Sequence, residues 1–397
     1  MTTRRLPPEI LDHIIDLLHD EPEALKQCCL TSKSWVPRTR RHLFANIELR
    51  SADDLASWTK TFQDIADSPA CHARTLFVGC PWLIVGADAG KGGWIRAFSR
   101  VAKLDVANDA RYFSALEISL TPFYKFSPSL KSLCIGPIRL PNPWLFDLIC
   151  SFPLLEDLSL TGRDKSLLSD DDTHGPRSLG PSTSPAFTGS LNFYIRGKGA
   201  GNTARQLLEL PNGLHFRKLV LSWDHKRDLW WNAELVTRCS HTLESLDITY
   251  TFRRTFIYVC VCASNLTPFP VGPEQGSFNL SNATKLRHVV FRPIWQTVEW
   301  ITVALQTITP QHRDFRQISI YVPYHSTPHD AEIVQSLGES IRRQWLDLDR
   351  LLVQFCESRS IRPRVGCVRQ GEKCENTEYF VGCLLPEMTK RGIVDPL

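Results

Sequence analysis

Apolar residues near the N-terminus recur at the spacing of short amphipathic helices. The stretch from Leu6 to Phe44 opens with Pro7 and Pro8, which suit the first turn of a helix because proline lacks the N–H that this turn leaves unpaired. Apolar side chains then follow at helical intervals, namely Ile10, Leu11, Ile14, Ile15 and Leu18. Pro22 and Pro37 stand where two further helices are expected to begin. The pattern therefore predicts three short helices.

A different pattern recurs after residue 70: an apolar residue, two variable residues, an apolar residue, one variable residue and a third apolar residue. The clear copies are Ala73-Leu76-Val78, Phe113-Leu116-Ile118, Leu130-Leu133-Ile135, Leu155-Leu158-Leu160, Phe216-Leu219-Leu221 and Leu243-Leu246-Ile248. Weaker copies are Leu286-Val289-Phe291, Phe315-Ile318-Ile320 and Leu348-Leu351-Val353, and Leu191-Phe193-Ile195 keeps only the alternation. Alternation directs every second side chain into a core, so each copy predicts a short strand.

Segments with helical spacing separate these strands, as crossovers between parallel strands require. The predicted helices are Trp144 to Ile149, Leu229 to Val236 and Ala331 to Trp345. Ahead of the repeats, a strand is expected at Asn46 to Arg50, and a helix at Ala52 to Ala66 with Ser51 as its N-cap. The chain from residue 71 onward thus predicts parallel strands with helices packed outside them.

Two resemblances follow from these patterns. The LPPEIL motif together with Leu25, Leu30, Ser32 and Trp35 resembles the F-box, a motif of three short helices that docks onto the Skp adaptor of cullin-RING ubiquitin ligases. The following WVPRTRRHLF is similar to F-box-like proteins of mushroom-forming fungi, although Pro37 departs from the commonest third helix. The strand phrase is that of leucine-rich repeats, and its irregular spacing resembles the degenerate repeats of F-box proteins.

The predicted fold class is α/β, with an N-terminal three-helix F-box and then an irregular leucine-rich-repeat solenoid of parallel strands and outer helices. The expected domains are residues 1–46, a connecting strand and helix at 47–70, the repeats at 71–360, and a C-terminal cap or tail at 361–397. Residues 162–185, rich in Ser, Asp, Gly and Pro, predict a disordered insertion. Two alternatives stay open: three helices that merely cap a larger domain, and an ordinary α/β domain whose strands happen to carry Leu-x-Leu.

Composition and charge narrow the classes of function. Hydrophobic residues make up 43% and charged residues 22% of the chain, as in globular proteins, and the formal net charge is only +4. The tightest basic cluster, Arg38, Arg40 and Arg41, is too small to argue for nucleic acid. The first residues contain no apolar signal region, and the longest apolar run, Phe256 to Ala263, is far shorter than the ~20 residues of a membrane helix. Neither nucleic acid nor membrane is an expected partner.

The cysteines and the absence of enzyme motifs further limit the expected location and function. Thirteen cysteines without a CxxC pair predict free thiols in a reducing compartment, the cytoplasm or the nucleus, and no metal or cofactor. The chain contains no GxSxG, P-loop, GxGxxG or HExxH motif, and the alternating Gly197, Gly199 and Gly201 indicate a tight strand exit. A non-catalytic protein is expected; a pair of carboxylates that meets only in three dimensions is the open enzyme alternative.

The F-box resemblance implies the substrate-recognition subunit of a Skp-cullin-F-box ubiquitin ligase, with the adaptor and an unknown target protein as partners. The alternative is a non-catalytic repeat scaffold unconnected to ubiquitination. The residues expected to dock the adaptor are Leu6, Pro7, Ile10, Leu11, Ile14, Leu18, Leu25, Leu30 and Trp35. A repeat solenoid is expected to hold its target on the exposed face of its strands. Alternation predicts that this face includes Asp157, Ser159, Ser245, Asp247, His288, Gln317, Ser319 and Tyr321.

Overall fold

A computed structural model of the 397-residue chain describes most of it. The described residues are 7–63, 68–79, 93–107, 123, 126–139, 145–163, 185–196, 199–223, 226–250, 278–293, 298–323, 337–369, 372–373, 377–393 and 395–396. The chain divides into two compact units: residues 1–161 with 171–186, and residues 162–170 with 187–397.

The first unit begins with the three predicted helices, α1 (Pro8–Leu17), α2 (Pro22–Thr31) and α3 (Val36–Leu43). Each carries a proline in its first turn, where no N–H is needed. The positions of the three helices in the sequence are therefore confirmed.

Parallel strands follow in chain order in the first unit. They are β1 (Asn46–Leu49), β2 (Thr75–Val78), β3 (Lys103–Ala107), β4 (Ser132–Arg139) and β5 (Asp157–Arg163). β1 to β4 pair in register, and Leu76, Leu104 and Leu133 stand side by side in the core, each fully buried. β3 was not predicted, although Val101-Leu104-Val106 fits the strand phrase with valine at two of its positions.

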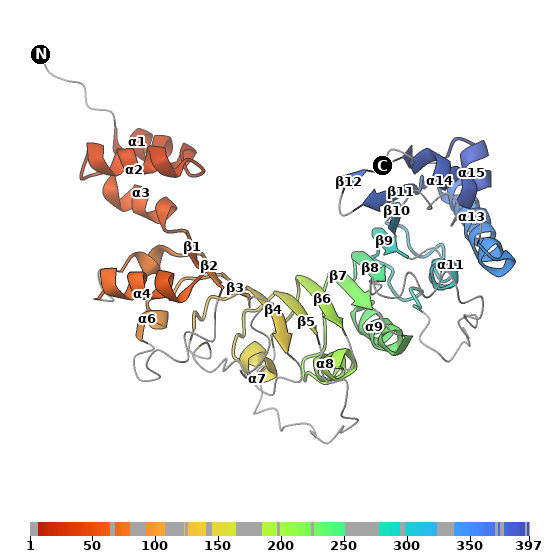
Figure 1. The fold of residues 1–397 in the computed structure, drawn as a ribbon, viewed down its shortest axis with the longest axis horizontal. Coiled ribbons are helices and arrows are strands. Elements are labelled where there is room, and N and C mark those ends of the chain that lie inside the picture. The colour runs from red at the N-terminus through yellow and green to blue at the C-terminus, as the bar shows by residue number, and fades with distance from the viewer. Residues whose placement is uncertain are drawn as a thin grey trace, which may run out of the picture. The chain divides into compact units, whose positions relative to one another are not determined.

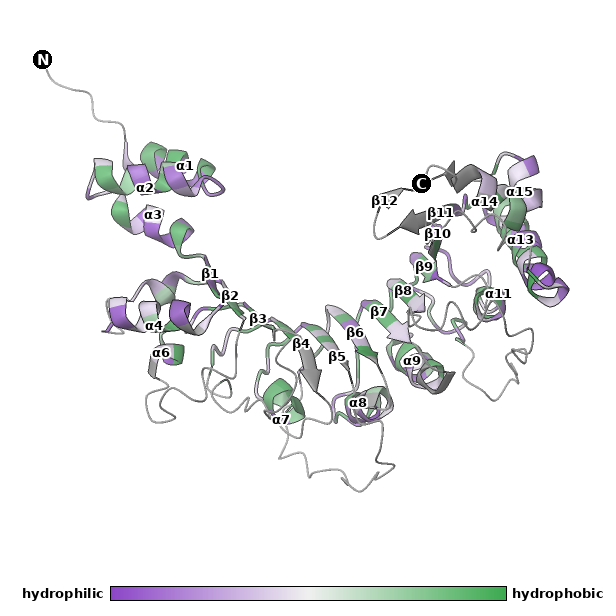
Figure 2. Cartoon of the chain, in the orientation of Figure 1, coloured by the Kyte–Doolittle hydropathy of each residue, from purple (hydrophilic) through white to green (hydrophobic). Residues whose placement is uncertain are grey.

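Besides α1 to α3, the described helices of the first unit are short. They are α4 (Ala52–Thr61), a 3-10 turn η1 (Pro69–His72), α6 (Gly93–Arg96) and α7 (Leu145–Cys150). Ser51 caps α4 as predicted: its hydroxyl accepts the N–H of Asp54, whose carboxylate accepts the N–H of Ser51 in return. The helix ends at Thr61, short of the predicted Ala66. α7 is coloured hydrophobic over most of its length (Figure 2), and its apolar residues Leu145, Phe146, Leu148 and Ile149 are buried.

The second unit repeats the pattern with six parallel strands. They are β6 (Ser190–Arg196), β7 (Lys218–Trp223), β8 (Ser245–Tyr250), β9 (His288–Arg292), β10 (Gln317–Pro323) and β11 (Arg364–Arg369). Neighbours in the chain are neighbours in the sheet, and Leu219, Leu246, Val289 and Ile318 occupy one buried row across it. Parallel pairing and the predicted inward positions are confirmed for β6 to β10.

Helices of the second unit lie on one side of its strands (Figure 1). They are α8 (Gly199–Leu208), α9 (Lys226–Cys239), α11 (Glu299–Gln306), α13 (Glu339–Arg359), α14 (Thr377–Leu384) and α15 (Pro386–Lys390). α8 packs closely on α9 through Gly201, where an added Cβ would stand 2.5 Å from Nε1 of Trp231. Gly199 and Gly201 therefore belong to a helix that follows β6, and Gly201 serves close helix packing.

Two predictions for the C-terminal region are wrong. Leu348-Leu351-Val353 is part of α13 and not a strand, because Trp345, Leu348, Leu352 and Phe355 recur at helical spacing and are all buried. Of the helix predicted at Ala331 to Trp345, residues 331–336 lie outside the described residues, and residues 339–345 form the start of α13.

The repeat also continues past residue 360, where it was expected to end. β11 extends the parallel order, and two-residue strands β12 (Glu372–Lys373) and β13 (Asp395–Pro396) pair with it, antiparallel and parallel respectively. Pro363 and Val365 occupy the two inward positions of the strand phrase at β11. Proline at the first of these positions made the phrase hard to identify in the sequence.

Other predictions fall beyond the described residues. These are the copy Phe113-Leu116-Ile118 and residues 164–184 of the predicted insertion, whose first two residues, Gly162 and Arg163, belong to β5. Among the described helices none is long and apolar enough to cross a membrane.

Candidate interaction surfaces

Helix α1 presents an apolar row that the rest of its unit leaves uncovered. Ile10, Ile14 and Leu17 stand at positions i, i+4 and i+7 and are 48%, 43% and 67% exposed. Leu30, at the end of α2, is 80% exposed. Eight large apolar side chains are exposed within the described part of the chain, and half of them lie in these two helices. Figure 2 shows both colours along α1, as expected for a helix with two different faces.

The opposite side of the helices forms a small core. Ile15 of α1 and Leu25 of α2 are each 1% exposed, and Thr39 of α3 is fully buried. The Thr39 hydroxyl donates to the carbonyl oxygens of Trp35 and Val36, and the Cys29 thiol lies 2.7 Å from it. The hydroxyl of this buried threonine is therefore hydrogen-bonded, as a polar group in a core requires.

The residues predicted to dock the adaptor separate into different positions. Pro7, Ile10, Ile14 and Leu30 are exposed, whereas Leu11, Leu18 and Trp35 are half-buried. Leu25 is buried and packs the three helices together, so it cannot reach a partner while they stay folded. Leu6 lies outside the described residues.

Leu17 was not among the residues predicted to dock the adaptor. The signal that identifies it is its spacing from Ile10 and Ile14, which separates this row from the row of Leu11, Ile15 and Leu18 on the neighbouring face.

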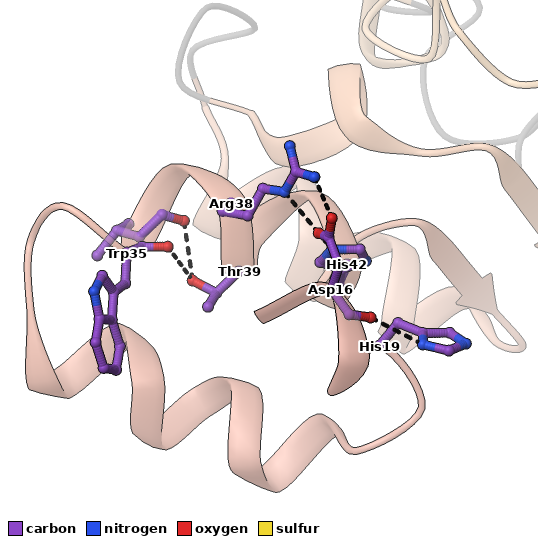
Figure 3. A network of polar contacts seen from close by, with 7 residues as sticks. Asp16, His19, Trp35, Arg38, Thr39 and His42 are labelled. Atoms are coloured by element: carbon purple, nitrogen blue, oxygen red, sulfur yellow. Dashed lines mark hydrogen bonds and ion pairs between the residues drawn. The ribbon is translucent and has the colours of Figure 1, made fainter. Parts of the chain in front are cut away.

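An ion-pair network fixes α1 against α3 (Figure 3). The Asp16 carboxylate accepts two hydrogen bonds from the Arg38 guanidinium, one of 2.7 Å from Nε, and His42 Nε2 stands 2.8 Å from its Oδ1. Hydrogen bonds from Arg38 and then from His42 hold the pKa of Asp16 well below its ordinary value. The paired hydrogen bonds from Arg38 to this carboxylate fix the orientation of α1 relative to α3. The apolar row of Ile10, Ile14 and Leu17 remains exposed in this arrangement.

Aromatic rings join the helices to the rest of their unit. Phe44, the residue after α3, contacts Trp58 and Phe62 of the α4 region, with ring centroids 6.4 and 6.5 Å apart. Trp58 in turn lies 5.8 Å from Phe98, which is fully buried. The edge-to-face geometry of the Phe44 contacts is favourable for aromatic pairs, so the three N-terminal helices pack on the rest of their unit.

The predicted strand-face residues are at least partly exposed with one exception. Asp157, Ser159, Ser245, Asp247, Gln317 and Tyr321 are half-buried and His288 is exposed, whereas Leu158 and Leu246 between them are buried. Ser319 is 1% exposed, so its predicted exposure is wrong. Val290 and Arg364 flank it on the neighbouring strands, and the Gln317 amide donates to its hydroxyl at 3.0 Å, so longer side chains cover the small one.

Three of these strands share a polar cluster. Arg292 of β9 donates to both carboxylate oxygens of Asp247 on β8, at 3.2 and 3.0 Å. The same guanidinium lies over the Tyr321 ring of β10, 4.7 Å from its centroid. The guanidinium of Arg292 thus neutralises the carboxylate of Asp247 on the strand face. Arg292 was not predicted, because its partner Asp247 stands 45 positions away in the chain.

No group of three or more His, Cys, Asp or Glu that could hold a metal ion occurs among the described residues. The arrangement instead offers two kinds of contact surface: an apolar row on short helices and a polar face on parallel strands.

No family model and no curated protein matches this chain. Among solved structures, a leucine-rich-repeat-containing protein, LegL7 from Legionella pneumophila, is similar over 86% of this chain and 98% of its own, with 11% sequence identity and a TM-score of 0.38. The assignment of a parallel repeat fold rests on the strand pairing described above.

Proposed function

We propose that this protein is the substrate-recognition subunit of a Skp-cullin-F-box ubiquitin ligase. The N-terminal helices would dock the Skp-type adaptor, which links to a cullin and a RING protein, and the repeats would hold a target protein. The chain itself would catalyse nothing, since transfer of ubiquitin is favoured by holding the target near the charged conjugating enzyme. The corresponding location is the cytoplasm or the nucleus.

One observation carries the proposal: the row of Ile10, Ile14 and Leu17 is exposed although a packed core exists directly behind it. An isolated amphipathic cap would turn its apolar side inward, as Ile15 does. Exposed apolar side chains gathered on one face are typical of a surface that a partner covers. The LPPEIL motif, which contains Ile10, resembles the F-box, and this resemblance favours the adaptor as that partner.

The test replaces Ile10 and Ile14 together with Asp in the whole chain. Anchors of this kind cost ~2 kcal/mol or more each when removed from an interface, so the double variant should bind purified adaptor roughly a thousandfold more weakly. Because both side chains are exposed, the fold should be retained.

The matched control places Asp at Leu154 and Leu346, which are 54% and 39% exposed elsewhere in the chain. This variant has the same loss of apolar surface and the same added charge. Equal adaptor binding by the Ile10→Asp/Ile14→Asp variant and by the unaltered chain would reject the proposal.

The second candidate is a repeat scaffold without a link to ubiquitination. The polar cluster of Asp247, Arg292 and Tyr321 favours a protein-binding role in either case, because such clusters resemble the mixed polar surfaces of protein interfaces. A scaffold would retain its targets in a pull-down from cells and would not retain the adaptor.

A further inference from the structure

At the edge of the second unit where its strands begin lies a row of four charged residues, three of them arginines. The residue that precedes each strand is Arg217 before β7, Glu244 before β8, Arg287 before β9 and Arg316 before β10. We call these four residues the edge row. Its three arginines are exposed, and the exposed Lys218 and His288 follow two of them in the chain.

Backbone hydrogen bonds hold the edge row together. The N–H of Glu244 donates to the carbonyl of Arg217 at 2.7 Å, that of Arg287 to Glu244 at 2.8 Å, and that of Arg316 to Arg287 at 2.9 Å. Each residue therefore stands one strand spacing, about 4.8 Å, from the next. The backbone of the sheet therefore fixes the order in which these four charged residues follow one another along the edge.

The row contains more positive charge than its own acid neutralises. Glu244 pairs with Arg287 at 3.5 Å. Within the described part of the chain, no carboxylate forms an ion pair with Arg217, Lys218 or Arg316. Like charges on neighbouring strands oppose sheet formation, so an edge that places Arg287 beside Arg316 is stabilised when an anion lies across it.

We propose that this edge row binds a short acidic segment of the target protein, an extended stretch with several Asp or Glu residues. The inference rests on the proposed function, because it specifies the target that the receptor would hold. From Arg217 to Arg316 the row spans three strand spacings, about 14 Å, which an extended peptide covers with about five residues. A run of acidic residues of that length would face all three arginines.

The charges around the row favour a peptide over a nucleic acid. Glu244 lies within the row, the exposed Asp314 lies two residues before Arg316, and Asp247 lies on the adjoining strand face. A nucleic acid carries its negative charge beyond the row and would meet Asp314 and Asp247 as well as Glu244, whereas a segment of about five acidic residues ends within the row.

The experiment measures binding of a fluorescein-labelled peptide with five consecutive Glu residues to the whole chain by fluorescence anisotropy. Peptides with five Gln residues and a labelled ten-nucleotide uridine RNA are compared at the same salt concentration. We expect the Glu peptide to bind at least tenfold more tightly than the Gln peptide and more tightly than the RNA. The difference should shrink as salt is added, since the cations are exposed.

Substitution locates the site. Arg287→Glu with Arg316→Glu should weaken binding of the Glu peptide at least tenfold, and the milder Arg316→Gln should weaken it by a smaller factor. The control, Arg343→Glu with Arg350→Glu on the exposed side of α13, makes the same change in net charge and should alter binding less than twofold. Circular dichroism checks that all variants are folded.

Unchanged peptide binding in the Arg287→Glu/Arg316→Glu variant would overturn the inference, as would equal losses in the α13 control. Tighter binding of the RNA through the same arginines would overturn it in favour of a nucleic-acid surface. Adaptor binding is measured separately on the same samples. If the unaltered chain binds the adaptor but does not bind the Glu peptide more tightly than the Gln peptide, only this inference is refuted and the proposed function stands.

Discussion

Replacing Leu246 with Ala tests the arrangement of the strands. Leu246 is fully buried in β8, and Leu219 of β7 and Val289 of β9 stand beside it in register. The substitution removes three carbon groups, worth about 2.4 kcal/mol at 0.8 kcal/mol each, and leaves a cavity that neighbouring strands cannot close. We therefore expect a loss of about 3–5 kcal/mol in the free energy of unfolding of the second unit.

The matched control is Ser245→Ala on the same strand. Ser245 is half-buried and faces the other side of the sheet, so its loss should change stability by less than about 0.5 kcal/mol. Urea unfolding followed by circular dichroism measures both, with the midpoint compared at equal slope. Equal destabilisation by the two variants would refute the assigned faces, because a one-residue slip exchanges the two sides of every strand.

Three further predictions concern single side chains. The hydrogen bonds of Asp16 to Arg38 and His42 depress its pKa, so its carboxylate stabilises the N-terminal helices fully above about pH 4, and this effect declines below that pH until the folded-state carboxyl itself is protonated. Asp16→Asn should therefore lower their melting temperature at pH 7 and lower it by a smaller amount at pH 3. Burial raises the pKa of Cys239 to about 12, so iodoacetamide at pH 8 should modify the exposed Cys71 quickly and Cys239 only after unfolding, as mass spectrometry of the peptides would show. Gly201→Ala should destabilise the second unit by about 1–3 kcal/mol in urea, since the new methyl group meets an indole of α9, whereas Gly338→Ala has open space and serves as the control.

Much of the fold could be predicted from local patterns. Helical spacing with proline in the first turn identified the three N-terminal helices, and the strand phrase identified most strands together with their inward side chains, such as Leu158 and Leu246. Both signals lie within a few neighbouring residues, where sequence spacing directly determines which side chains share a face.

The errors arose where one short pattern fits two structures. Leu348, Leu351 and Val353 satisfy the strand phrase, yet the longer series from Trp345 to Phe355 fits a helix better, and only the longer window decides between them. The strand β3 was missed although Val101, Leu104 and Val106 satisfy the apolar phrase.

The candidate surfaces were harder to predict because they join residues that are distant in the chain. The edge row brings Arg217, Arg287 and Arg316 together, while the sequence showed only the local cluster at Arg38 to Arg41. The burial of Ser319 likewise depends on neighbours contributed by two other strands. Periodicity predicts which way a side chain points, and the neighbouring strands determine how much of it is covered.

Hydrogen–deuterium exchange of the whole chain, with and without purified Skp adaptor, tests the central claim most directly. A docked partner suppresses local opening of the helices it covers, so amide exchange there becomes slower. The account predicts slower exchange in α1 and α2, which carry Ile10, Ile14, Leu17 and Leu30, and unchanged exchange in strands β6 to β11. Unchanged exchange in α1 and α2 at saturating adaptor, or slowing confined to the strands, would contradict it.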